Sequence, residues 1–83
     1  MLETVIHKYG PLGFDLTEIE GRPTHVGVQS GQIYVWTIKN YKGENTKRNV
    51  RLYATGEPFD GLVVGSVVTP HGLVWHVVED SNG

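Results

Sequence analysis

The chain has 83 residues, of which 39% are hydrophobic and 19% are charged, a composition typical of one small globular domain. Its net charge of −2 argues against nucleic acid or a membrane surface as a partner attracted by bulk charge. The absence of cysteine excludes disulfides, thiolate nucleophiles and Cys-type zinc sites. No apolar run approaches the roughly 18 residues that a membrane-spanning helix needs.

The start of the chain, Met1-Leu2-Glu3, carries no basic region before an apolar core. We therefore expect no secretory signal and a cytoplasmic location. A domain of this size without disulfides relies on a tight core or on self-association, so we expect a homo-oligomer. We expect one domain over residues 1–80, followed by a frayed tail over 81–83, and no cofactor.

Residues near the N-terminus favour β-structure. Leu2–Tyr9 is rich in strand formers and is followed by the breakers Pro11 and Gly13, so we predict a strand there. The apolar residues of Phe14–Glu20 do not keep a single phase. That segment fits either a strand with a bulge or a single helical turn.

A hairpin is predicted where His25–Gln29 and Gln32–Asn40 flank the dipeptide Ser30-Gly31. Gly at the second turn position favours a type I′ turn, in which both central residues have positive φ. The second strand alternates Ile33, Val35 and Thr37 with Tyr34, Trp36 and Ile38. Because both sets are largely apolar, we expect a central strand that is covered on both faces.

The second half of the chain contains three further strands by the same criteria. A polar loop, Tyr41–Thr46, precedes a strand over Lys47–Thr55, which Gly56-Glu57-Pro58 terminates. Leu62–Thr69 and Leu73–Glu79 then form a hairpin joined by Pro70-His71-Gly72. Six or seven short antiparallel strands with little or no helix predict an all-β domain, either a small barrel or a two-layer sandwich.

Charge is unevenly distributed along the chain. Residues 39–51 carry a net charge of +4, whereas residues 52–83 carry −4. A basic segment of this kind attracts a phosphate or an acidic protein surface. The alternative is that these cations only keep a polar loop soluble, as surface lysines often do.

Within this region, alternation along Lys47–Thr55 separates the apolar residues from a polar face with an aromatic ring. We predict a ligand site on the face of Arg51, Tyr53 and Thr55, with Arg48 beside that face and with Gly56 and Glu57 in the loop that follows. The two arginines would bind a diphosphate, and Tyr53 would stack on a base. Glu57 would accept hydrogen bonds from ribose hydroxyls, and Gly56 would allow close backbone approach. The alternative for Thr55–Pro58 is a plain turn.

Other chemistry-bearing residues give weaker indications. His7, His25, His71 and His76 lack the spacing of metal ligands, so stacking or a single hydrogen bond is the expected role of each. We expect Trp36 and Trp75 in the core, and Tyr34, Tyr41 and Tyr53 at the surface. No nucleophile elbow, phosphate loop or carboxylate pair is present, so we expect no enzymatic activity.

Four short motifs together resemble a family of short, functionally uncharacterised proteins that phages and prophages encode. They are Ile6-His7-Lys8-Tyr9, His25-Val26-Gly27-Val28-Gln29 with Gly31 and Trp36, Thr55-Gly56-Glu57-Pro58, and Trp75-His76-Val77. The family has no activity to transfer, so the resemblance assigns no catalytic residue. It implies a small accessory protein in the host cytoplasm, acting by binding.

The resemblance and the predicted site together give a functional hypothesis. The protein would sequester a phosphate-bearing, nucleotide-like signalling molecule and so counter bacterial anti-phage defence. Two alternatives stay open. One is an inhibitor or adaptor that binds a host defence protein through a strand edge or through the basic loop 41–48. The other is a minor virion or assembly component.

Overall fold

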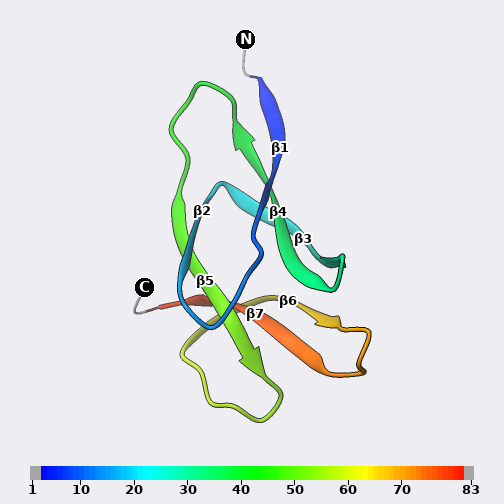
Figure 1. Cartoon of the computed structure of the whole chain (residues 1–83). Helices are drawn as coiled ribbons and strands as arrows, with labels where there is room; N and C mark the ends of the chain where they lie inside the picture. Colours follow the sequence, from blue (N-terminus) through cyan, green and yellow to red (C-terminus); the bar gives the residue numbers. More distant parts are fainter. Residues whose placement is uncertain (1–2, 82–83) are drawn as a thin grey trace.

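The computed structural model describes residues 3–81 and shows seven β-strands in two sheets (Figure 1). The strands are β1 (Thr4–Tyr9), β2 (Thr17–Glu20), β3 (Arg22–Gln29), β4 (Gln32–Asn40), β5 (Lys47–Ala54), β6 (Gly61–Val68) and β7 (Val74–Asp80). Over this described range, no helix long and apolar enough to cross a membrane is found.

The two sheets form an open sandwich. The first has the order β1-β4-β3 and the second the order β2-β5-β7-β6, and every pairing is antiparallel. The layers meet where β3 packs on β6 and β2 packs on β4 (Figure 1). Each sheet keeps its own edge strands, so the molecule is a sandwich and not a closed barrel.

The core lies between the inner faces of the two sheets. Its buried cluster consists of Leu12, Ile19, Ile33, Val35, Val50, Leu52, Val67 and Val77. β-branched side chains dominate because they pack well against a pleated surface. β4 and β5 run through the middle of their sheets, and alternate residues of each strand supply half of this cluster.

Most predicted elements are confirmed. The strand Gln32–Asn40 has the predicted bounds, and the turn before it has positive φ at both Ser30 (52°) and Gly31 (75°). The segment Phe14–Glu20 contains the short strand β2 and no helical turn. β3 begins three residues earlier than predicted, and its register shifts between Pro23 and His25. Leu2 and the tail residues 82–83 lie outside the described part of the chain.

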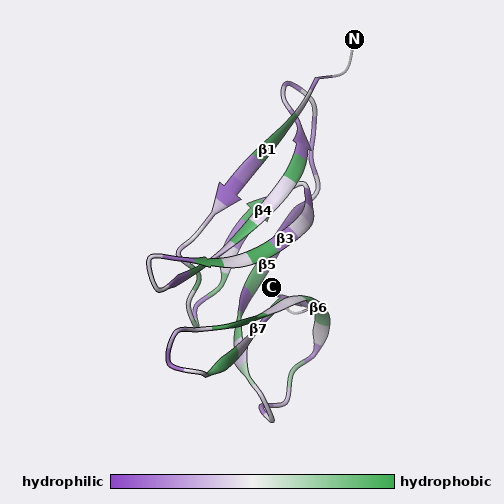
Figure 2. Cartoon of the chain, turned by 90° about the vertical axis from the view of Figure 1, so that its right-hand side faces the viewer, coloured by the Kyte–Doolittle hydropathy of each residue, from purple (hydrophilic) through white to green (hydrophobic). Residues whose placement is uncertain are grey.

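One prediction about β4 is wrong. Its inner residues Ile33, Val35 and Thr37 are buried, as expected, and the strand is central in its sheet. The residues between them remain half-buried on a face that no other layer covers, so Trp36 is not a core residue. Figure 2 shows that residues of different hydropathy follow one another along β4. The sequence misleads here because an aromatic side chain on a sheet is apolar whether or not a second layer covers it.

A buried hydroxyl joins the two layers. Thr37 on β4 has no exposed surface, and its Oγ1 donates a hydrogen bond of 2.7 Å to the main-chain oxygen of Glu20 at the end of β2. Without this hydroxyl, the carbonyl of Glu20 would have no hydrogen-bond donor from Thr37 at a position shielded from water, which costs stability. The hydroxyl therefore fixes how β2 sits against the first sheet.

Replacing Thr37 with Val should lower the free energy of unfolding by about 1–3 kcal/mol, because the shape is kept while the bond to Glu20 is lost. Urea denaturation followed by circular dichroism measures this. Thr24→Val is the matched control, since that hydroxyl makes a longer bond of 3.4 Å at the surface. Equal stability of the Thr37→Val protein and the wild type would show that the link between the layers contributes nothing.

Candidate functional site

The outer face of β5 carries a network of three polar side chains. Arg51 donates from Nε to the Tyr53 hydroxyl at 2.8 Å and also from Nη2 to the same oxygen. The Tyr53 hydroxyl in turn donates to Oδ2 of Asp80 on β7 at 3.0 Å. The Arg51 Nε also lies 3.2 Å from that carboxylate oxygen. Strand pairing explains the arrangement, because Arg51 and Tyr53 lie on one face of β5, next to β7.

This network holds the charge of Arg51 in place. The hydrogen bond with Tyr53 raises the pKa of the guanidinium above its ordinary value, and neighbouring carboxylates add to the effect, while desolvation opposes it. The Arg51 side chain remains 39% exposed, whereas that of Asp80 is 8% exposed. The guanidinium of Arg51 is therefore accessible to solvent, while the carboxylate of Asp80 that it contacts is buried.

Tyr53 itself is buried, with 5% of its surface exposed. The loop between β5 and β6 lies over it, so that the Phe59 ring is 5.7 Å from the Tyr53 ring between centroids. The Arg51 guanidinium lies 4.8 Å from the centroid of the same ring. The prediction that Tyr53 is a surface residue is therefore wrong, because its ring already has neighbours. The sequence could not show that a loop folds back over this face.

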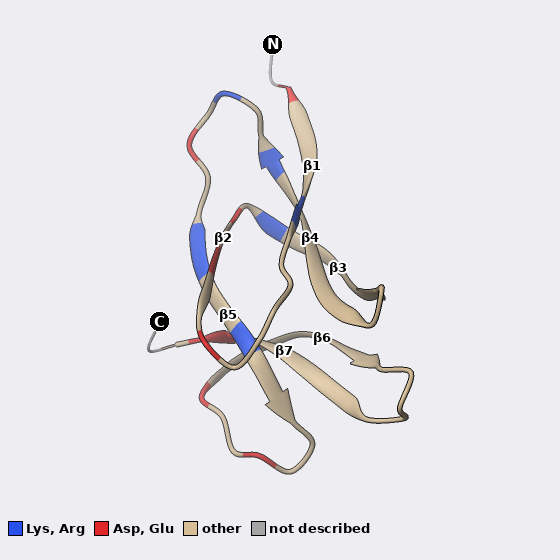
Figure 3. Cartoon of the chain, in the orientation of Figure 1, with Lys and Arg blue, Asp and Glu red and all other residues tan. Residues whose placement is uncertain are grey.

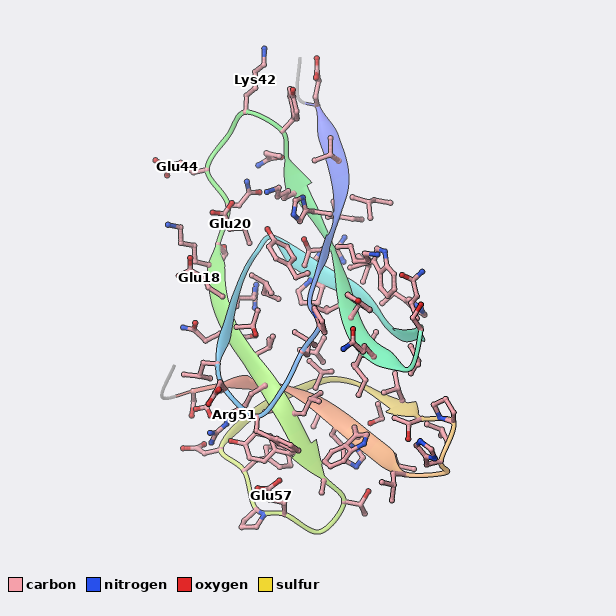
Figure 4. All side chains as sticks on the ribbon, in the orientation of Figure 1. Glu18, Glu20, Lys42, Glu44, Arg51 and Glu57 are labelled. Carbon is pink, nitrogen blue, oxygen red and sulfur yellow. The ribbon has the colours of Figure 1, made fainter. Side chains whose placement is uncertain are left out.

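A cavity of about 230 Å³ opens beside this buried ring. It lies between the ends of β5 and β7 and the loop that follows β5. Its lining is mostly apolar and consists of Tyr53, Ala54, Thr55, Gly56, Glu57, Phe59, Val63 and His76. Figure 4 labels Arg51 on β5 and Glu57 in the loop that follows this strand.

The polar part of the cavity wall is a histidine held between two hydroxyls. The Oγ1 of Thr55 lies 2.8 Å from Nε2 of His76, and the Oγ of Ser66 lies 2.6 Å from Nδ1. In a neutral imidazole, one nitrogen donates and the other accepts, and hydroxyls satisfy both in either tautomer. The ring is thus fixed in orientation at the cavity wall.

Glu57 has a structural role in this loop. Its Oε1 accepts a bond of 3.0 Å from the amide of Ala54, and its own amide donates to the carbonyl of Ala54 at 3.1 Å. Gly56 between them has a φ of +91°, which L side chains rarely adopt. The turn that the sequence offered as an alternative is therefore present, and it presents Glu57 at the cavity.

Arg48 lies apart from the other predicted site residues. Its Nη1 donates to Oε2 of Glu79 at 2.8 Å, and its buried Nε has no hydrogen-bond partner among the described residues. It borders a different, polar groove of about 380 Å³ near the start of β5. The expected joint action of Arg48 and Arg51 on one diphosphate has no support in this geometry.

The structure thus divides the predicted set. Tyr53, Thr55, Gly56 and Glu57 line one cavity, Arg51 contacts its wall through Tyr53, and Arg48 belongs elsewhere. Sequence reasoning missed Phe59, Val63 and His76. Alternation placed His76 on a strand face, but only the pairing of Tyr53 with His76 across β5 and β7 brings it to this site.

The histidines do not gather. In the part of the chain that the structure describes, no group of three His, Asp or Glu side chains could hold a metal ion. His71 lies in the turn before β7. The ring centroids of His7 and Tyr9 are 4.5 Å apart, and the two ring planes are tilted by 45°. His25 lies on the outer face of the first sheet, 5.3 Å from Trp36 between ring centroids.

A family model described as "Domain of unknown function (DUF7352)" matches residues 3–83. The chain belongs to this family. Neither the curated proteins nor the solved structures contain a match to it. Membership of the DUF7352 family brings no activity with it.

Removing the Tyr53 hydroxyl tests the network beside the cavity. Tyr53→Phe should lower the free energy of unfolding by about 1–3 kcal/mol, because the buried carboxylate of Asp80 loses a donor. Chemical denaturation gives the value, and Tyr41→Phe is the control, since Tyr41 is exposed in a loop. If both variants unfold at the same denaturant concentration as the wild type, the hydroxyl is not a support for Asp80.

Proposed function

We propose that this DUF7352 protein is a non-enzymatic binding protein that sequesters a small, nucleotide-like molecule with an aromatic ring and a negative charge. The observation that supports this proposal most directly is the single cavity that four of the predicted site residues share. Arg51 stands next to that cavity on the ring of Tyr53. The apolar walls suit the aromatic ring of such a ligand, and the adjacent cation suits its negative charge.

The size of the cavity favours partial insertion of such a ligand. Sites that enclose a whole small molecule usually measure about 300–1,000 Å³, and this one has about 230 Å³. A ring would fit between Phe59, Val63 and the imidazole of His76. The charged part of the ligand would stay at the mouth, where solvent and Arg51 are available.

Arg51 is suited to hold that charged part. A guanidinium has five N–H donors, and within the described residues the bonds of the network engage Nε and one donor of Nη2. The buried support of Asp80 limits the side-chain entropy that Arg51 would lose on binding. The carboxylate of Asp80 also lowers the local potential, which favours a ligand with a modest negative charge over a free polyphosphate.

The biological role that we propose follows from the resemblance to small phage and prophage proteins. Sequestration of a nucleotide signal in the host cytoplasm would counter anti-phage defence without any chemical step. This role is consistent with the absence of a recognisable catalytic motif in the sequence.

Isothermal titration calorimetry against ADP-ribose and cyclic dinucleotides tests the proposal. We expect binding to the wild type, and a loss of at least tenfold in affinity for both Arg51→Ala and Phe59→Ala. Lys47→Ala is the matched control, because Lys47 is an exposed cation on the same strand, away from the cavity. Absence of binding to the wild type, or full affinity of the Arg51→Ala protein, would contradict the proposal.

A second candidate function, protein–protein association, is favoured by the hairpin β6–β7. Residues 61–78 contain no Lys, Arg, Asp or Glu, and Figure 3 shows β6 and the turn after it without charge. Large apolar side chains are exposed along it, namely Leu62 (69%), Val63, Val68 (65%), Leu73 and Val74. Exposed apolar surface of this kind usually marks an interface.

The overall dimensions support a second copy of this chain as the partner. A compact monomer of 9.2 kDa exposes about 4,900 Å², whereas this chain exposes 5466 Å². Its radius of gyration of 13.0 Å also exceeds the roughly 11.8 Å expected for 83 residues. The uncharged hairpin would bring no like charges together across a two-fold axis.

Light scattering coupled to size-exclusion chromatography tests this self-association. We expect a dimer or a larger closed oligomer for the wild type, and a monomer for Val68→Lys at the same protein concentration. Leu16→Lys is the control, since Leu16 is an exposed apolar residue outside the hairpin. A monomeric wild type at high micromolar concentration would exclude this interface.

A further inference from the structure

The outer face of the first sheet carries a row of aromatic rings that no other layer covers. The register pairs Trp36 on β4 with Lys8 on β1 and with His25 on β3, so these three side chains lie on one face. Tyr34 is the next residue on that face of β4. The ring centroids of His25 and Trp36 are 5.3 Å apart, and those of Trp36 and Tyr34 are 6.4 Å apart.

Gly27 leaves room for these rings. A Cβ at this position would lie 3.0 Å from Nε2 of His25 and 3.3 Å from the ring of Trp36. Both rings therefore occupy the space above a bare stretch of β3 backbone. His25 is exposed, and Tyr34 and Trp36 are half-buried, so ring surface remains available for contact.

The charge of this sheet has one sign. β1, β3 and β4 contain Lys8, Arg22 and Lys39 and no Asp or Glu (Figure 3). The Nζ of Lys8 lies 4.7 Å from the centroid of the Tyr34 ring, within the aromatic row. Arg22 is exposed, and its pairing with Ile38 in the register places it on the same face of the sheet as Trp36. Counting charge along the sequence hid this feature, because the acids of residues 1–38 lie outside these strands.

We propose that this face, formed by Tyr34, Trp36, His25, Lys8 and Arg22, binds single-stranded nucleic acid. Bases would stack on Trp36 and His25, and the two exposed cations would contact the phosphates. Aromatic rings flanked by cations on an open sheet are the combination that single strands require. The face is separate from the cavity, so this inference does not depend on the proposed ligand.

The chemistry of the face selects this partner over others. A duplex hides the faces of its bases, so stacking on Trp36 requires unpaired nucleotides. A neutral sugar would use the rings but would leave the cations unused. Stacking accepts any base, so we expect little sequence preference and strong dependence on salt.

Fluorescence anisotropy with a labelled oligothymidylate of about ten nucleotides tests the proposal at low salt. We expect micromolar binding by the wild type and a loss of at least tenfold for Trp36→Ala. With two phosphate contacts, the slope of log K against log salt should be about −1.4, falling to about −0.7 for Lys8→Ala. Trp36→Phe keeps a ring and should retain most of the affinity, which separates stacking from a folding defect.

Tyr41→Ala and Lys42→Ala are the matched controls, because this exposed aromatic–cation pair lies in a loop away from the sheet face. Both should bind the oligonucleotide as the wild type does. Three results would overturn the proposal: no binding of the oligonucleotide at low salt, unchanged binding by Trp36→Ala, or binding of neutral oligosaccharides in its place. Equal losses in both control variants would also overturn it, because binding would then not depend on the residues of this sheet face.

Discussion

The strict alternation of side chains along β4 and β5 is the constraint on which the rest of this structure depends. On each strand, one set of residues closes the core, and the other set forms a surface with chemistry: the aromatic row on β4 and the Arg51–Tyr53 network on β5. A shift of register by one residue would exchange the two sets and destroy core and surfaces together. The small core tolerates no such shift, so the same interactions that stabilise the fold also position the candidate sites.

Ion pairing across strands decides where charge acts. The basic segment 39–51 is not a free cationic surface, since Lys39, Arg48 and Arg51 pair with acids from β2 and β7. The first sheet, by contrast, carries no acidic residue within its strands. Of the cations of this sheet, Lys39 is paired with Glu20, so the outer face of the sheet offers Lys8 and Arg22 to an anion.

Three of the surfaces that the described residues form differ in character: a small apolar cavity beside Arg51, an aromatic and cationic sheet face, and an uncharged hairpin. A domain of this size buries about 60% of its unfolded surface, so it has little interior to spare and keeps much apolar surface outside. Because the cavity wall includes Val63 of the hairpin, the surface proposed for self-association adjoins the cavity proposed for ligand binding. The aromatic face is on the other layer and stays independent of both.

The sequence by itself determined the all-β class, the strands to within a few residues and the turn at Ser30-Gly31, since these follow from local alternation and from glycine at turns. It also placed Thr55, Gly56 and Glu57 together, because they are consecutive. The same alternation sets Arg48 and Arg51 on opposite faces of β5, because they are an odd number of residues apart. Only the tertiary structure decided that Tyr53 is buried and that His76 and Phe59 join the cavity. These outcomes depend on which strands pair and on which face a loop covers, and contacts between residues distant in sequence leave no local pattern to read.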